Sequence, residues 1–205
     1  TEFLLYADDI KSLRQINSIE DCKHLQENLN KVHKWCLCNT LSLNFIKCKV
    51  MSYSRTKNTL NFDYLIGSDT INRPEFVQDL GVTFDKHLNF NEQVNTVTNK
   101  ACKTLRFFMK STRDFSKFET TRHLFKALVR SKLEYASIIW NPVTKMNIDS
   151  IERVQRRLLK CLAFRLDGLY PQRGIAQKNL LHRFDMLPEN CGIVIPKILI
   201  KWSNE

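Results

Sequence analysis

The sequence predicts an α+β fold in which a strand-rich unit, residues 1–90, is followed by a helical unit, residues 91–205. Short apolar runs typical of strands are confined to the first unit, which also contains one amphipathic helical stretch. Beyond residue 90, apolar residues recur mainly at three- and four-residue steps, as they do along one face of a helix. The charge balance changes at the same place. Residues 1–90 carry 11 Lys+Arg and 11 Asp+Glu, whereas residues 91–205 carry 21 and 10.

A β-hairpin is predicted at the start of the chain. The apolar run at residues 3–7 ends in two adjacent carboxylates, Asp8 and Asp9, and apolar residues recur at positions 10, 13 and 16. Because Asp is a favoured turn residue, we expect the two acids at the tip of the hairpin. The apolar side chains of the first strand are expected to be buried.

Residues 18–39 are predicted to form an amphipathic helix. Ser18 and Asp21 have the spacing of a capping box, and the apolar residues from Cys22 to Cys36 recur at three- and four-residue steps. Asn39 is expected to end the helix in a left-handed conformation, which Asn tolerates better than most residues.

The rest of the first unit reads as strands. Gly67-Ser68-Asp69 lies between two short apolar segments and predicts a hairpin turn. Gly81 lies inside another apolar run, where a glycine often marks a bulge or the close approach of another backbone. The predicted strand regions are residues 41–53, 61–71 with the hairpin turn inside it, and 76–84.

The second unit is predicted to be helical throughout. A capping box at Ser116-Lys117-Phe118-Glu119 opens its second helix, which stops before Asn141-Pro142. The predicted helices are residues 91–113, 117–140, 149–165 and, more weakly, 173–186 and 191–203. In the second of them the residues expected to face inward are Leu124, Leu128, Tyr135 and Ile139.

Two groups of basic residues in this unit have helical spacing. One is expected on the second helix and the other on the third, where each would present a row of positive charge. Such rows can contact successive phosphates of a nucleic-acid duplex without reading its sequence; the alternative is an ordinary solvated face. The residues are Arg122, Lys126 and Arg130 in the first group, and Arg153, Arg156, Arg157 and Lys160 in the second.

Composition limits the class of protein. An apolar fraction of 43% in 205 residues is enough for a hydrophobic core, and no apolar run has the length needed to span a bilayer. The seven cysteines have no disulfide-framework spacing, so we expect free thiols in a reducing, intracellular compartment. A zinc site at His33, Cys36 and Cys38 is disfavoured because positions 36 and 38 lie on different faces of a helix.

The paired carboxylates have a chemical interpretation. Oxygen ligands at one point attract Mg²⁺, which prefers carboxylates and substrate phosphates, and two such ions can hold both the attacking and leaving oxygens of a phosphoryl transfer. Asp8 and Asp9 are therefore candidate catalytic metal ligands. The alternative is a turn in which paired aspartates bind nothing, which is common.

Several motifs, in order along the chain, resemble reverse transcriptases of LINE-type, jockey-like non-LTR retrotransposons. Phe3-Leu4-Leu5-Tyr6-Ala7-Asp8-Asp9 resembles motif C, and Val32-His33-Lys34-Trp35-Cys36 the segment that follows it. The remaining matches are Leu41-Ser42-Leu43-Asn44 with Lys47-Cys48-Lys49-Val50-Met51 (motif D), Leu80-Gly81-Val82 (motif E, the primer grip), residues 128–136 with Trp140-Asn141-Pro142 (the thumb), and Glu152-Arg153-Val154-Gln155-Arg156-Arg157 (the helix after it).

The resemblance implies an RNA-directed DNA polymerase. Residues 1–90 would be the C-terminal part of a palm, made of antiparallel strands and a helix, and residues 91–205 a helical thumb with the helices that follow. Asp8 and Asp9 would bind Mg²⁺, two ions in the complete enzyme, and Lys47 would assist departing pyrophosphate. Tyr6, Leu80 and Gly81 would lie near the primer. The implied partners are an RNA template, a DNA primer duplex and a dNTP, in the nucleus or cytoplasm and not at a membrane.

Two departures from the family pattern affect this interpretation. The third metal-binding Asp and the fingers of such enzymes would lie before Thr1, so we expect the chain to be part of a longer product and inactive alone. Cys191-Gly192 stands where the family usually has paired Arg residues. Two alternatives stay open: a non-catalytic basic remnant that binds nucleic acid, and a helical interaction module whose acids are incidental.

Overall fold

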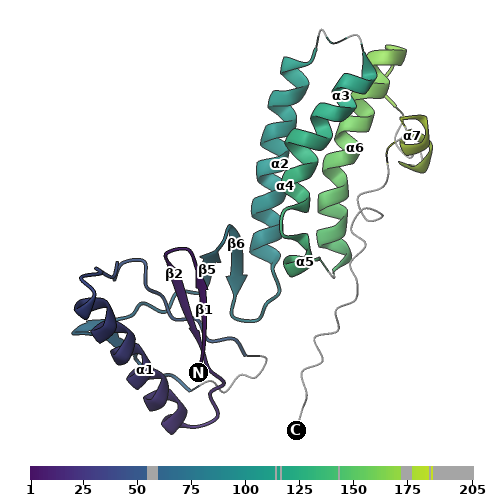
Figure 1. Ribbon diagram of the computed structural model, residues 1–205. Helices are drawn as coiled ribbons and strands as arrows, with labels where there is room; N and C mark the ends of the chain where they lie inside the picture. The colour runs from purple at the N-terminus through teal and green to yellow at the C-terminus, as the bar shows by residue number, and fades with distance from the viewer. Residues whose placement is uncertain are drawn as a thin grey trace. The chain divides into compact units, whose positions relative to one another are not determined.

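The computed structural model describes residues 1–54, 60–113, 115, 117–142, 144–171, 177–184 and 186 (Figure 1). The fold is mixed α+β, with helices and short antiparallel strand pairs. The chain divides into two compact units. The first consists of Thr1–Asp79 with Phe84–Leu88, and the second of Leu80–Thr83 with Asn89–Glu205.

The first unit begins with the predicted hairpin. Strands β1 (Glu2–Tyr6) and β2 (Asp9–Leu13) are antiparallel, with Tyr6 opposite Asp9, and Ala7 adopts φ 52° in the two-residue turn between them. The expectation that the sides of β1 are buried is wrong, because every residue of this strand is exposed. A two-stranded sheet has two faces to cover, and the described part of the first unit has too few elements to cover either.

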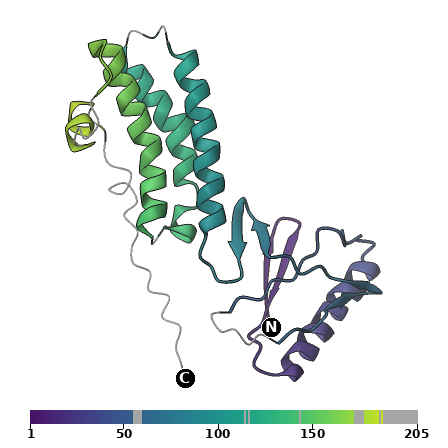
Figure 2. The ribbon, with the colours of Figure 1, turned by 180° about the vertical axis from the view of Figure 1, so that it is seen from behind.

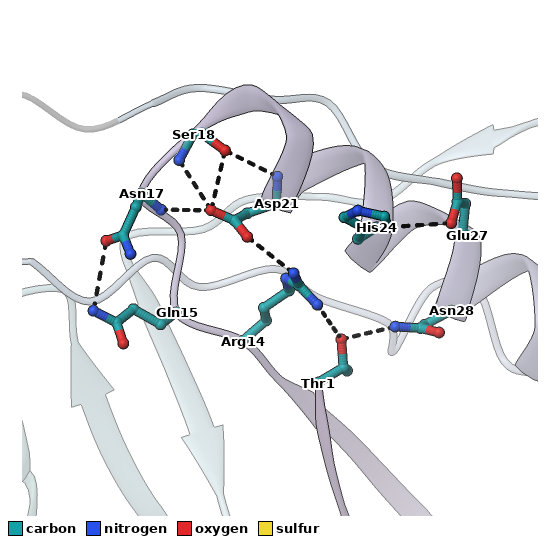
Figure 3. A network of polar contacts seen from close by, with 9 residues as sticks. All are labelled: Thr1, Arg14, Gln15, Asn17, Ser18, Asp21, His24, Glu27 and Asn28. Atoms are coloured by element: carbon teal, nitrogen blue, oxygen red, sulfur yellow. Dashed lines mark hydrogen bonds and ion pairs between the residues drawn. The ribbon is translucent and has the colours of Figure 1, made fainter.

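Helix α1 (Ile19–Cys38) forms as its capping residues predict. The Ser18 hydroxyl accepts a hydrogen bond from the Asp21 backbone N–H, and the Asp21 carboxylate accepts one from the Ser18 backbone N–H, which closes the capping box (Figure 3). Arg14, at the end of the hairpin, donates to the same carboxylate at 2.9 Å. The left-handed residue at the other end is Thr40 (φ 55°) rather than Asn39.

The strand predicted over residues 41–53 is absent from that described segment. The chain turns at residues 45–47 because Asn44 accepts two hydrogen bonds from the Lys47 backbone N–H, one at its carbonyl oxygen and one at its side-chain oxygen. Lys49 makes only an isolated parallel bridge, to Asn72. The Asx-type turn therefore prevails over the apolar alternation of residues 43–51.

Two short hairpins complete the strands. Strands β3 (Leu65–Ile66) and β4 (Asp69–Thr70) flank Gly67, as predicted, but are shorter than expected. Strands β5 (Phe76–Asp79) and β6 (Val82–Asp85) replace the single strand expected over residues 76–84. Leu80 and Gly81 reverse the chain with φ 43° and 80°, so Gly81 belongs to a two-residue hairpin turn, in which both central residues have positive φ.

In its described residues, the second unit consists of helices and their connections apart from the residues at its β6 end. In both ribbon views α2, the α3–α4 segment and α6 run side by side (Figures 1 and 2). Its elements are α2 (Asn91–Ser111), α3 (Phe118–Phe125), the π-helix η1 (Lys126–Arg130), α4 (Ser131–Glu134), α5 (Ser137–Trp140), α6 (Lys145–Asp167) and α7 (Gln177–Arg183). Its core is built mainly from Val94, Ala101, Leu105, Phe108, Phe125, Val129, Leu133, Trp140, Val154, Leu158 and Leu159.

The second predicted helix is interrupted. The π-turn η1 inserts extra backbone at residues 126–130, and Ala136 adopts φ 52° between α4 and α5. Lys117 is the N-cap of α3 and makes no side-chain capping bond; Ser116 lies outside the described residues.

The expected inward face of that helix is also wrong. Leu128, Tyr135 and Ile139 are exposed and Leu124 is half-buried, whereas the buried residues include Thr121, Phe125, Val129, Leu133 and Trp140. The first four of these follow an uninterrupted four-residue spacing, so they form the row that faces the core.

Helix α6 starts earlier than predicted. Thr144 is its N-cap and accepts a hydrogen bond from the Asn147 backbone N–H. Gly168, with φ 69°, ends the helix as the sequence predicts. Helix α7 occupies part of the segment predicted at 173–186, and residues 191–203 lie outside the described part of the chain. Among the residues that the structure describes, no helix is both long and apolar enough to cross a membrane.

Candidate metal site and nucleic-acid interface

The two candidate metal ligands lie at the tip of the β1–β2 hairpin. Asp8 is in the turn and Asp9 is the first residue of β2, and both are exposed. Neither carboxylate has a hydrogen bond or ion pair with any other residue that the structure describes. Two adjacent unpaired carboxylates repel one another, and a divalent cation would relieve that repulsion.

The neighbouring side chains leave this charge uncompensated. Tyr6, directly opposite Asp9, is exposed. Lys11 lies on the same side of β2 as Asp9, because alternate residues of a strand point the same way. Its ammonium is paired with the carboxylate of Asp79 on β5 at 2.7 Å. Sequence reasoning missed this pair, because nothing local connects residues 68 positions apart.

The two carboxylates alone do not make a complete set of metal ligands. Within the described residues no group of three or more His, Cys, Asp or Glu side chains is placed to hold a metal ion. The chemistry of Asp8 and Asp9 suits Mg²⁺, since both side chains are hard oxygen donors exposed to solvent. The set at His33, Cys36 and Cys38 is separated as expected, with Cys36 buried and Cys38 exposed.

Lys47 lies in a different setting from the one predicted. It is exposed in the turn at residues 45–47, not on a strand, and no hydrogen bond or ion pair joins it to Asp8 or Asp9. Burial raises the pKa of the adjacent Cys48 thiol. The local geometry therefore gives Lys47 no specific partner among the described residues.

The Leu80–Gly81 turn is held by a residue that the sequence placed in the protein core. The Tyr135 hydroxyl donates to the Leu80 carbonyl oxygen at 2.9 Å. A Cβ on Gly81 would lie 3.3 Å from Cε1 of Tyr135, so the ring also packs against the bare backbone there. The Trp140 indole N–H in turn donates to the Tyr135 carbonyl oxygen at 2.8 Å. The turn is thereby connected to Trp140, a fully buried residue.

The predicted basic row on the second helix is not continuous. Arg130 is only 9% exposed, and its guanidinium donates to the Glu134 carboxylate at 2.5 Å. Lys126 is exposed, and Arg122 lies 5.9 Å from the ring centroid of Phe118. Arg130 lies beside the buried Val129 within η1 and pairs with Glu134, so it does not form one exposed row with Lys126.

The second basic group is divided among several partners. Arg153 is exposed, whereas the Arg156 guanidinium approaches Glu152 and Asp149 at 3.6 and 3.8 Å. The other two members make contacts of a different kind. Arg157 donates to Cys102 Sγ at 3.2 Å, and the Lys160 ammonium lies 6.0 Å from the ring centroid of Tyr170.

Comparisons of the chain with protein-family models, with curated proteins and with solved structures found no match.

Proposed function

We propose that this chain is the C-terminal palm and thumb portion of an RNA-directed DNA polymerase, a reverse transcriptase of the non-LTR retrotransposon type. The observation that carries the proposal is the placement of Asp8 and Asp9 at an exposed hairpin tip with no cationic partner among the described residues. Adjacent exposed acids without a cationic partner suit a site that is completed by metal and substrate phosphate.

Different residues of the chain would have different roles in nucleotidyl transfer. Asp8 and Asp9 would hold Mg²⁺, and the bound ion would neutralise charge on the reacting phosphoryl oxygens. A primer strand could approach the backbone of the Leu80–Gly81 turn closely, because Gly81 has no side chain. Its conformation is held by the Tyr135 hydroxyl. Exposed cations such as Lys126 and Arg153 supply sequence-independent phosphate contacts.

The chain alone is expected to be inactive. Among the described residues no third acidic, His or Cys side chain joins Asp8 and Asp9, and two ligands hold Mg²⁺ only weakly, with millimolar affinity as the expected order because this ion dehydrates reluctantly. Primer extension by this chain should therefore be undetectable, and robust extension would show that it is complete.

A binding experiment tests the metal site directly. Mn²⁺ added to the full chain should broaden the amide resonances of residues 6–10 before any others, because the paramagnetic ion replaces Mg²⁺ at oxygen ligands. Asp8→Asn and Asp9→Asn should each reduce this broadening, and the double variant should remove it. Asp69→Asn is the matched control, since Asp69 is a single exposed carboxylate beside another hairpin turn.

Broadening centred elsewhere, or unchanged in the double variant, would refute the metal role of the pair. Lys47→Ala should leave Mn²⁺ binding unchanged, because Lys47 has no contact with either carboxylate.

A non-catalytic nucleic-acid-binding role is the second candidate, and the segregation of charge favours it, since the whole basic excess lies after residue 90. Duplex binding that falls steeply with salt and persists in the Asp8/Asp9 double variant, together with absent Mn²⁺ broadening, would favour this second function.

A further inference from the structure

The outward face of α2 carries an unusual concentration of positive charge. Its members recur at three- and four-residue steps and are all exposed: Lys100, Lys103, Arg106, Lys110 and Arg113, here named the α2 basic face. Arg113 lies just beyond the end of the helix. The face is opposite the buried row that runs from Val94 to Phe108. It therefore points away from the helical core.

The α2 basic face differs from an ordinary solvated helix surface. Such surfaces usually pair acidic and basic residues at four-residue spacing, but residues 93–113 contain no Asp or Glu. No side chain of this face has a hydrogen bond or ion pair with another described residue. Only Lys110 has a local explanation, because a cation in the last turn interacts favourably with the helix dipole.

Neighbouring helices add positive charge beside this face. The Lys132 ammonium of α4 donates to Thr104 Oγ1 at 2.7 Å, and Arg157 of α6 donates to Cys102 Sγ at 3.2 Å. Cys102 and Thr104 precede and follow Lys103 in the sequence, so they flank the α2 basic face, one on each side. Charge complementarity therefore favours a polyanion as the partner.

An aromatic side chain indicates which polyanion. Phe107 lies among these cations, between Arg106 and Lys110 in sequence, and is 72% exposed. A base within a duplex is already stacked on both sides, whereas an unpaired base can stack on an exposed aromatic ring. An acidic peptide would use the cations and leave the ring without a specific partner.

We propose that the α2 basic face with Phe107 binds single-stranded nucleic acid, with phosphates on the cations and one base stacked on Phe107. The face extends for about 20 Å at 1.5 Å per helical residue, which is long enough for several nucleotides. The site does not involve the hairpin carboxylates and so stands independently of the proposed metal chemistry.

The test uses the full chain and a fluorescein-labelled 12-nucleotide RNA, single-stranded or annealed to its complement. Anisotropy titrations at several salt concentrations report the affinity and its salt dependence. Phe107→Leu should weaken single-strand binding about tenfold, a typical loss for one stacked base, and change duplex binding by less than twofold. Phe107→Trp should restore binding. Phe76→Leu, at an exposed Phe of β5, is the matched control.

A charge-reversal pair tests the phosphate contacts. Lys103→Glu with Lys110→Glu should weaken single-strand binding and lower the salt slope by about 1.4, at about 0.7 per phosphate contact. Lys23→Glu with Lys31→Glu makes the same change of net charge at exposed positions of α1 and should have little effect. Circular dichroism melts confirm that each variant is folded.

Three outcomes would overturn the proposal. An unchanged affinity in Phe107→Leu would exclude base stacking. An equal loss in the α1 control pair would mean that net charge alone drives binding. Displacement of the RNA by polyglutamate at matching charge concentration would identify an acidic peptide as the better ligand. Binding that persists in the Asp8/Asp9 double variant would show that this site is distinct from the metal site.

Discussion

Tyr135 connects an exposed loop to the protein core. Sequence periodicity placed it inward, but its ring is exposed and its hydroxyl holds the Leu80 carbonyl oxygen. Leu80, with φ 43°, is in a conformation that non-glycine residues rarely adopt. Such strain persists only where neighbouring groups enforce it, and here the Tyr135 hydrogen bond and ring contact do so.

Gly81→Ala should therefore destabilise the chain more than Gly168→Ala. Both glycines have positive φ, but a Cβ at Gly81 would also press on the Tyr135 ring, whereas nothing lies within 4 Å of one at Gly168. Gly168→Ala, the control, should lower the free energy of unfolding by about 1 kcal/mol from backbone strain alone. Gly81→Ala should lower it by more, as measured by urea unfolding. Equal losses in the two variants would mean that the Tyr135 ring moves aside at little cost.

Tyr135→Phe should lower the free energy of unfolding by about 0.5 kcal/mol, because the lost hydrogen bond is partly exposed.

Asp21 should make the stability of α1 depend on pH in the acid range. The hydrogen bond from Arg14, together with the backbone N–H groups of Asn17 and Ser18, lowers its pKa from 3.8 to about 2. Because the folded state has the lower pKa, the stabilisation is complete above about pH 4 and is lost as the pH falls towards 2. In an acid titration of helicity followed by circular dichroism, Asp21→Asn should no longer show the loss of stability as the pH falls. A titration identical to that of the unaltered chain would show that other carboxylates dominate.

At the scale of elements, a feature can be predicted from the sequence when all the residues that form it lie within a few positions of one another. The α1 capping box needs only Ser18 and Asp21, and the β1–β2 turn needs only its own residues, so both could be predicted. The strand expected at 41–53 does not form, because Asn44 accepts hydrogen bonds from the Lys47 backbone N–H and forms a turn instead. The alternation of apolar residues gives no indication of this turn. The π-turn η1 could not be predicted, because it has no sequence signature.

Burial separates two basic residues that the sequence grouped together, because Arg130 is largely buried and Lys126 is exposed. Arg130→Met should lower the free energy of unfolding by about 1 kcal/mol, because it removes a largely buried guanidinium and leaves Glu134 without its partner. Lys126→Met should leave stability nearly unchanged, since Lys126 is exposed. Thermal unfolding of the two variants, monitored by circular dichroism, measures the difference. Equal stability would mean that Arg130 is solvated in solution.

At the scale of the molecule, the sequence predicted the kinds of element better than their contacts. The hairpin tip that presents Asp8 and Asp9 is a local feature, whereas the ion pair between Lys11 and Asp79 and the bond from Tyr135 to Leu80 join residues far apart in sequence. The α2 basic face was not predicted, although its acid-free spacing is visible in the sequence.

The β1–β2 hairpin should make the whole chain self-associate. Leu5 is 75% exposed on a strand whose outer edge pairs with no other described strand, and such an edge is a template for pairing with another chain. Sedimentation velocity should show association that increases with concentration. Leu5→Lys should suppress it by placing a charge on the strand. Met146→Lys, at a side chain that is 73% exposed on α6, should not, since a helix has no unpaired edge. A monomer at every concentration, or suppression by both variants, would show that the hairpin edge does not drive association.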